Sequence, residues 1–423
     1  MVRHRPPTYL AVALTSAFFA LGASASADEV FKATSVVTGF GSQLIKSFDI
    51  SFVDANRPVY LLADRTNAAI DVVNTRTNAL VKQLTPGFVG FTGNNDTSGP
   101  NGVLIGENQD VWVGDGNSTM WVIDLNSGQV DAKISTGTTA NRADELCFDP
   151  DDHIIMMAND ADKPPFVTMW DSRQSHHFAF LGKITFDGSS AKTPLATNGI
   201  EQCQYNPRSH KFLLNLPEIN GPGDDTGNGA VAVIDPRHLA QPERIFVLDH
   251  NKCAGPQGMA VGPGNQVLLG CNAPSGITAS LPNGNGNFSS VIIDDDADRI
   301  LATINNESGP DEVWFNPGDG HYFLGRSGVV PPPGTNQLLG VIDSGRESAD
   351  QSVATATKPN PPAASSHSVA ADPVRNQVYV PIGPNSGTTC SSAGGSDAQG
   401  CIAIYTTQHD DVAMNHDHDH DHD

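Results

Sequence analysis

The 423-residue sequence predicts an all-β protein, a seven-bladed β-propeller closed by an N-terminal strand. Three observations lead to this fold class. A sequence motif typical of a β-hairpin recurs seven times. Each copy of the motif is followed by a third and usually a fourth apolar strand, and one further strand precedes the first copy. Four antiparallel strands per repeat form the blade of a propeller, and a turn-rich composition with 41 Gly and 29 Pro agrees with this fold.

The repeated motif begins with a small residue and one polar residue. An apolar strand, a turn of the Gly-Pro or Asp-Pro type and a second apolar strand follow. Residues 255–271 (GPQGMAVGPGNQVLLGC) and 309–326 (GPDEVWFNPGDGHYFLGR) show it clearly. The polar residue marks the register of each copy, and the marks are spaced as blades require. The seven marked residues are Asp49, Asn101, Asp144, Glu201, Gln257, Asp311 and His367.

The ends of the repeat array predict how the ring closes. The last copy runs out of chain after CIAIYTTQ (401–408), one strand short of a blade, whereas the strand FKATSVVTG (31–39) precedes the first copy and has no hairpin of its own. An N-terminal strand that completes the last blade would remove the exposed edges. We therefore expect one propeller over residues 28–407.

The segments that flank the propeller have other roles. Arg3 and Arg5, the apolar run 10–21 and an Ala-x-Ala site before Asp28 predict a signal peptide over residues 1–27. We therefore expect a secreted or periplasmic protein without membrane insertion, because the apolar run is too short to span a bilayer. Residues 408–423 are a low-complexity, acidic tail that should be disordered.

Six cysteines in an exported chain favour disulfides. We expect Cys390 to pair with Cys401 across a Gly/Ser-rich loop, and Cys253 can meet Cys271 from the two ends of one hairpin. The remaining pair, Cys147 and Cys203, lies on the first strands of consecutive blades but differs by one step in register. Alternate residues of a strand point to opposite sides, so this pair is left open between a disulfide and two buried thiols.

The first strand of each blade lines the central channel, so the seven marked residues should converge on one channel mouth. Crowded carboxylates there require water, protons or a cation to relieve their repulsion. The alternatives are a water-filled polar channel and a divalent cation site, for which an oxygen-rich ligand set favours Ca²⁺. The predicted metal ligands are Asp49, Asn101, Asp144, Glu201, Gln257 and Asp311, and His367 is the candidate catalytic base because imidazole titrates near neutrality. Glu145 and Glu312 adjoin two of these positions, and either neighbour could point inward.

Loop lengths distinguish the two faces of the predicted ring. The loops between second and third strands are long in the later blades, at residues 217–229, 272–288, 327–336 and 383–400, and they share the face of the marked residues. We expect a small-molecule or protein ligand there, because binding functions concentrate on loops held by a rigid scaffold. Without residues 1–27, which hold two Arg and no acidic residue, the net charge changes from −23 to −25. Such a charge disfavours nucleic acid, and the chain is expected to be a monomer.

The tail adds a second predicted metal site. Its imidazoles alternate with aspartates, a mixture that binds Zn²⁺, Ni²⁺ or Cu²⁺ without fixed geometry. These predicted ligands are His416, His418, His420 and His422. A solubilising acidic tail is the alternative interpretation.

The segment GPNGVLIGENQDVWVGDGNSTMWVIDLNSGQVDAKI (99–134) and its six counterparts resemble the YncE or YVTN-type family of bacterial exported propellers. The repeats are more distantly similar to those of the SMP-30/gluconolactonase and streptogramin lyase propellers. The resemblance implies architecture more firmly than activity. We therefore expect an exported binding or scaffold protein with an acidic axial cation site. The alternative is a metal-dependent hydrolase or lyase that acts on a small lactone, ester or cyclic substrate at the channel mouth.

Overall fold

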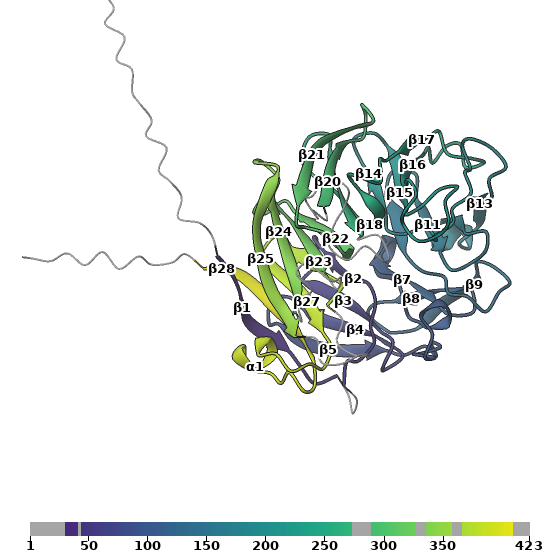
Figure 1. Cartoon of the computed structure of the whole chain (residues 1–423). Coiled ribbons are helices and arrows are strands. Elements are labelled where there is room, and N and C mark those ends of the chain that lie inside the picture. The colour runs from purple at the N-terminus through teal and green to yellow at the C-terminus, as the bar shows by residue number, and fades with distance from the viewer. Residues whose placement is uncertain (1–29, 41–43, 273–288, 327–335, 358–365, 409–423) are drawn as a thin grey trace, which may run out of the picture.

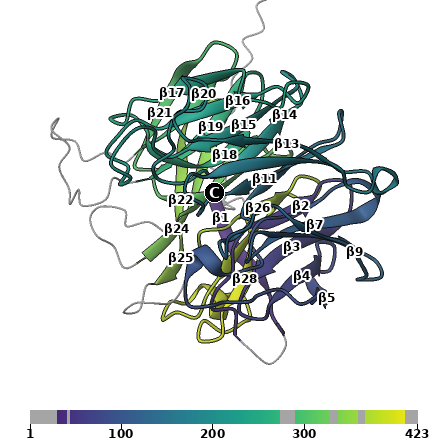
Figure 2. The same ribbon diagram turned by 90° about the vertical axis from the view of Figure 1, so that its right-hand side faces the viewer.

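The computed structural model describes residues 30–40, 44–272, 289–326, 336–357 and 366–408. In these ranges the chain forms seven four-stranded antiparallel sheets, arranged as a seven-bladed β-propeller. The blades follow one another in chain order, from purple through teal and green to yellow (Figures 1 and 2). The predicted fold class is confirmed.

Each of the first four blades consists of four strands that are consecutive in the sequence. Their bounds are β2 (Ser51–Asp54), β3 (Val59–Asp64), β4 (Ala69–Asn74) and β5 (Ala79–Leu84); β6 (Val103–Ile105), β7 (Asp110–Asp115), β8 (Thr119–Asp124) and β9 (Val130–Ser135); β10 (Leu146–Asp149), β11 (Ile154–Asn159), β12 (Phe166–Asp171) and β13 (Phe180–Thr185); β14 (Cys203–Asn206), β15 (Lys211–Leu216), β16 (Ala230–Ile234) and β17 (Arg244–Val247).

Blades five and six repeat this order, and blade seven takes its outer strand from the N-terminus. Their bounds are β18 (Ala254–Val261), β19 (Gln266–Asn272), β20 (Ser289–Asp294) and β21 (Arg299–Asn305); β22 (Pro310–Asn316), β23 (His321–Arg326), β24 (Asn336–Asp343) and β25 (Ser348–Thr357); β26 (Ala370–Asp372), β27 (Gln377–Ile382), β28 (Cys401–Gln408) and β1 (Val30–Val37). Short helical turns are η1 (Asn95–Thr97), η2 (Glu107–Gln109), η3 (Gln174–His176) and α1 (Thr389–Ser392).

The closing strand lies where the sequence predicts it. β1 pairs antiparallel with β28, and the two strands lie side by side in the last blade (Figure 1). The first strands of neighbouring blades contact one another round the ring, including β26 against β2. Because the first and last strands of the chain share one sheet, the last blade has four strands, as the other six blades do.

The turns after the third strands depend on aspartate side chains. Each such carboxylate accepts a hydrogen bond from a backbone N–H two or three residues later, the pattern of an Asx turn. The residues are Asp124, Asp171, Asp235, Asp294 and Asp343. Their assignment to turn structure is therefore confirmed.

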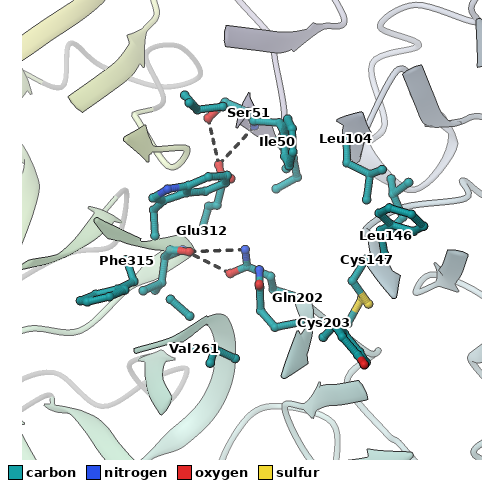
Figure 3. A pocket seen from close by; sticks show the side chains of 18 of the residues that line it. Ile50, Ser51, Leu104, Leu146, Cys147, Gln202, Cys203, Val261, Glu312 and Phe315 are labelled. Atoms are coloured by element: carbon teal, nitrogen blue, oxygen red, sulfur yellow. Dashed lines mark hydrogen bonds between the residues drawn. A yellow bond between two sulfur atoms is a disulfide. The ribbon is translucent and has the colours of Figure 1, made fainter. Parts of the chain in front are cut away.

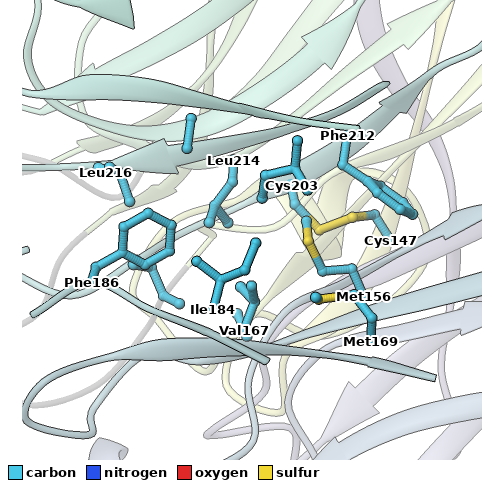
Figure 4. Packing of buried hydrophobic residues seen from close by; sticks show 14 of the residues in the cluster. Cys147, Met156, Val167, Met169, Ile184, Phe186, Cys203, Phe212, Leu214 and Leu216 are labelled. Atoms are coloured by element: carbon cyan, nitrogen blue, oxygen red, sulfur yellow. A yellow bond between two sulfur atoms is a disulfide. The ribbon is translucent and has the colours of Figure 1, made fainter. Parts of the chain in front are cut away.

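All six cysteines form disulfides, as Cys147–Cys203, Cys253–Cys271 and Cys390–Cys401. The last two pairs were expected. The first pair was left open because the two residues point to opposite sides of their own sheets. That argument fails because stacked blades meet through opposite faces, so a residue from each facing side can reach the other (Figure 4).

Among the described residues, no helix is long and apolar enough to cross a membrane.

Candidate functional site

A polar cavity of about 530 Å³ occupies one mouth of the axial channel. Six of the seven marked residues line it, and each lies within a first strand or in the three residues before one: Asp49, Asp144, Glu201, Gln257, Asp311 and His367. The propeller thus gathers carboxylates that are far apart in the sequence within one cavity. The seventh residue, Asn101, is fully buried and is not among the residues that line the cavity.

Three of these side chains form a compact group that could hold a metal ion. One potential ligand atom from each of Asp49, Asp311 and His367 lies within 4.8 Å of the other two. His367 Nε2 is 3.4 Å from Asp49 Oδ1 and 3.8 Å from Asp311 Oδ2. The imidazole ring stacks on Phe48 at a centroid distance of 5.1 Å, which fixes the orientation of the nitrogen towards the two carboxylates.

A buried arginine, which the sequence reasoning missed, organises one side of the cavity. Arg65 is 2% exposed and forms an ion pair with Asp49. Its Nη2 also donates to Asn101 Oδ1 over 2.7 Å, so the predicted ligand Asn101 is engaged by the guanidinium. Arg65 directly follows β3, in a loop on the channel-mouth face. An arginine at that position in the sequence was the signal that could have predicted a cation beside the carboxylates.

A second, largely buried arginine, Arg142, lies next to Arg65, since both guanidinium groups donate hydrogen bonds to Asn95. Arg142 Nη2 lies 2.6 Å from Asp144 Oδ2 and 2.9 Å from Asp160 Oδ2. Arg142 stands two residues before the marked Asp144, in the segment that leads into the first strand of its blade. Asp144 is therefore the partner of a guanidinium. The seven predicted residues are four acids, two amides and one imidazole, and two arginines form ion pairs with two of the acids.

The two arginines make the carboxylates of the cavity chemically unequal. Burial raises the pKa of Asp49, but the Arg65 charge, together with His367 and Arg142, outweighs it and lowers that pKa to about 2. Burial and the neighbouring Asp160 and Asp311 carboxylates raise the pKa of Glu201 well above its usual range. Burial likewise raises the pKa of Asp311, which the His367 charge opposes. A cation at the cavity would relieve the repulsion at Glu201 and Asp311.

The neighbours of the marked residues form the next layer along the channel. Gln202 Oε1 accepts from the backbone nitrogens of Met259 (2.6 Å) and Val313 (3.2 Å), which ties blades four, five and six together. Glu312 accepts from Ser51 and Val369 nitrogens at 3.2 and 3.0 Å. Of the two adjacent acid pairs, Asp311 lines the polar cavity while Glu312 lies deeper, whereas Asp144 and Glu145 both line the polar cavity.

Residues at the ends of second strands form hydrogen bonds and ion pairs away from the polar cavity. Asp64 accepts the Asn67 N–H, and Asp115 accepts the Trp121 indole N–H at 2.9 Å. Arg326 forms a buried ion pair with Glu307 at 2.9 Å. None of these residues is among those that line the polar cavity.

The face with the channel mouth also carries the predicted long loops. The loop at 217–229 is organised by Glu218, whose carboxylate accepts the Gly227 N–H at 2.7 Å and the Thr197 hydroxyl at 2.8 Å. Next to it is a second polar cleft of about 610 Å³, which shares Glu201 and Gln257 with the axial cavity. Of the other long loops, 383–400 contains α1, whereas residues 273–288 and 327–335 lie outside the described residues, as do the signal segment and the tail histidines.

Neither a protein-family model nor a curated protein matches this sequence. The fold and the site therefore define the class: a seven-bladed β-propeller, cross-linked by three disulfides, with an acidic axial cavity and a group of side chains suited to a metal ion.

Proposed function

We propose that the protein is an exported β-propeller that binds a divalent cation at the axial triad and recognises a small molecule or protein on the surrounding loop face. The convergence of Asp49, Asp311 and His367 carries this proposal. Three disulfides support an extracellular or periplasmic location, because such bonds persist in oxidising compartments. Membership of the YncE or YVTN-type family belongs to the same proposal and rests on the repeat pattern.

The ligand chemistry favours Zn²⁺ over the Ca²⁺ that the sequence suggested. The sequence counted Asn101 as an oxygen ligand and His367 as a base, whereas Asn101 Oδ1 accepts from Arg65 and His367 faces the two carboxylates. One imidazole with two carboxylates suits Zn²⁺ or another transition ion, while Ca²⁺ needs six to eight oxygens. Three protein ligands would leave a coordination position open for an anionic or carbonyl group of a bound ligand.

Titration calorimetry with ZnCl₂ and CaCl₂ tests the proposal on protein that ends at residue 408, so that the tail histidines cannot contribute. We expect about one Zn²⁺ per chain. Asp311→Asn and His367→Ala should each weaken binding at least tenfold, because each removes one of three ligands. Asp131→Asn, a change to an exposed carboxylate on β9, is the matched control and should bind as the parent does.

Thermal unfolding gives a second readout. Zn²⁺ at a hundredfold excess over its Kd should stabilise the native protein by about 2.7 kcal/mol. A parent protein that takes up neither ion, or that binds Zn²⁺ equally well after Asp311→Asn, would refute the axial site. The hydrolase or lyase alternative requires the same cation and would be lost with it.

A further inference from the structure

A second, chemically different cavity occupies the other end of the channel. Its volume is about 400 Å³, within the range of about 300–1,000 Å³ typical of small-molecule sites. The polar cavity is lined from the starts of the first strands, whereas this one is lined from their later residues and from turn residues such as Pro150 and Pro317. Ile50 and Glu145 line both cavities and so form the layer between them.

The wall of this second cavity is made largely of apolar side chains from different blades. Ile50, Leu104, Leu146, Val261 and Phe315 surround it (Figure 3). Of these, Leu146, Val261 and Phe315 are only half-buried although they lie at the axis of the molecule. Apolar surface left accessible at the centre of a rigid ring is the usual lining of a site for an apolar ligand.

One polar atom in this wall lacks a partner. Glu312 is fully buried, and its Oε2 accepts hydrogen bonds from the Ser51 and Ser368 hydroxyls and from two backbone nitrogens. Its Oε1 is also buried and accepts no hydrogen bond from any described residue. Gln202, which Figure 3 also labels, already accepts hydrogen bonds from the backbone nitrogens of Met259 and Val313. A buried oxygen without a partner costs about 1–3 kcal/mol, which a ligand donor could recover.

We propose that this cavity binds a small, uncharged, largely apolar molecule that carries one hydrogen-bond donor, such as an aromatic or alicyclic alcohol, with the donor directed at Glu312 Oε1. The apolar walls exclude a strongly hydrated ligand, because its charge would lose its water without a counter-charge. An anion would find no positive charge there, because no Lys, Arg or His is among the described residues that line this cavity. This site is separate from the proposed cation site and does not depend on it.

The full-length protein can be tested with 2-naphthol as the probe and 2-methoxynaphthalene as its matched partner without the donor. We expect saturable one-to-one binding of 2-naphthol by calorimetry, with or without EDTA. The methyl ether should bind about three- to tenfold more weakly, the value of one hydrogen bond. Glu312→Gln, which can replace the accepting oxygen with an amide donor, should remove this preference.

A cavity-filling variant locates the binding. Leu146→Trp should reduce affinity for 2-naphthol at least tenfold, whereas the matched control Leu181→Trp, on an exposed position of β13, should leave it unchanged. Circular dichroism establishes that each variant is folded, and if Leu146→Trp is not, Val261→Trp fills the cavity from β18 instead. Failure of the parent to bind either naphthalene, or undiminished binding by a folded filling variant, would overturn the proposed site. Equal affinity of the parent for the two probes would overturn the role of Glu312.

Discussion

Replacing Phe31 by alanine tests whether the N-terminal strand closes the propeller through packing as well as through strand pairing. Phe31 is 1% exposed, although it is the second residue of the first described strand. Its ring meets Phe323 of blade six edge-on at a centroid distance of 5.3 Å, and its backbone nitrogen donates to Gln351 Oε1 over 3.0 Å. A single residue of β1 therefore contacts blade six through both its side chain and its backbone.

The expected loss follows from this environment. Burial of a phenylalanine removes about 150–250 Å² from water, and the lost transfer free energy and the cavity left behind together make Phe→Ala cost about 3–5 kcal/mol in a core. The edge-on contact with Phe323 contributes to the upper part of that range. The control is Phe180→Ala, because Phe180 is also on an outer strand but is 55% exposed.

Equilibrium unfolding in guanidinium chloride, with the disulfides intact, measures both variants against the parent. Phe31→Ala should lower the free energy of unfolding by about 3–5 kcal/mol, whereas Phe180→Ala should cost about 1 kcal/mol or less. Equal small losses in the two variants would refute the idea that β1 locks the ring through Phe31.

Two further predictions concern the blades. Burial raises the pKa of Asp64 to about 6 and that of its neighbour Asp71 well above the usual range. Both carboxyls hold protons more tightly in the folded state, so their contribution to stability is complete below about pH 4 and is lost as the pH rises through 6 and beyond. Asp71→Asn should therefore lose less stability than the parent between pH 4 and pH 8, by thermal unfolding at each pH; parallel profiles would contradict this. The Cys147–Cys203 bond closes a loop of 56 residues, so Cys147→Ala with Cys203→Ala should cost about 4 kcal/mol on the chain-entropy estimate, by chemical unfolding. The matched removal of Cys253–Cys271, whose loop is 18 residues, should cost about 3 kcal/mol, and a reversed order would show that strain or residual structure dominates.

The sequence by itself determined the fold class, because each blade carries a local signal that is repeated. Alternating apolar residues and turn chemistry specify the strands and their hairpins, and Asp124 and its counterparts specify the turns after the third strands. The missing strand after residue 408 and the extra strand at 31–39 predicted the closure, since strand count is a property of the chain. The register marks likewise predicted which residues face the polar mouth, of which six of seven line it.

Only the tertiary structure decided which neighbours those residues have there. Asn101 accepts a hydrogen bond from Arg65, which comes from another blade. Cys147 and Cys203 also come from different blades, and they meet because adjacent sheets present opposite faces. The apolar cavity that Glu312 helps to line has no signature in any one blade, since the strands contribute one or a few residues each to its wall. Interactions between blades depend on distances and directions set by stacking, whereas a repeat pattern records only what every blade does for itself.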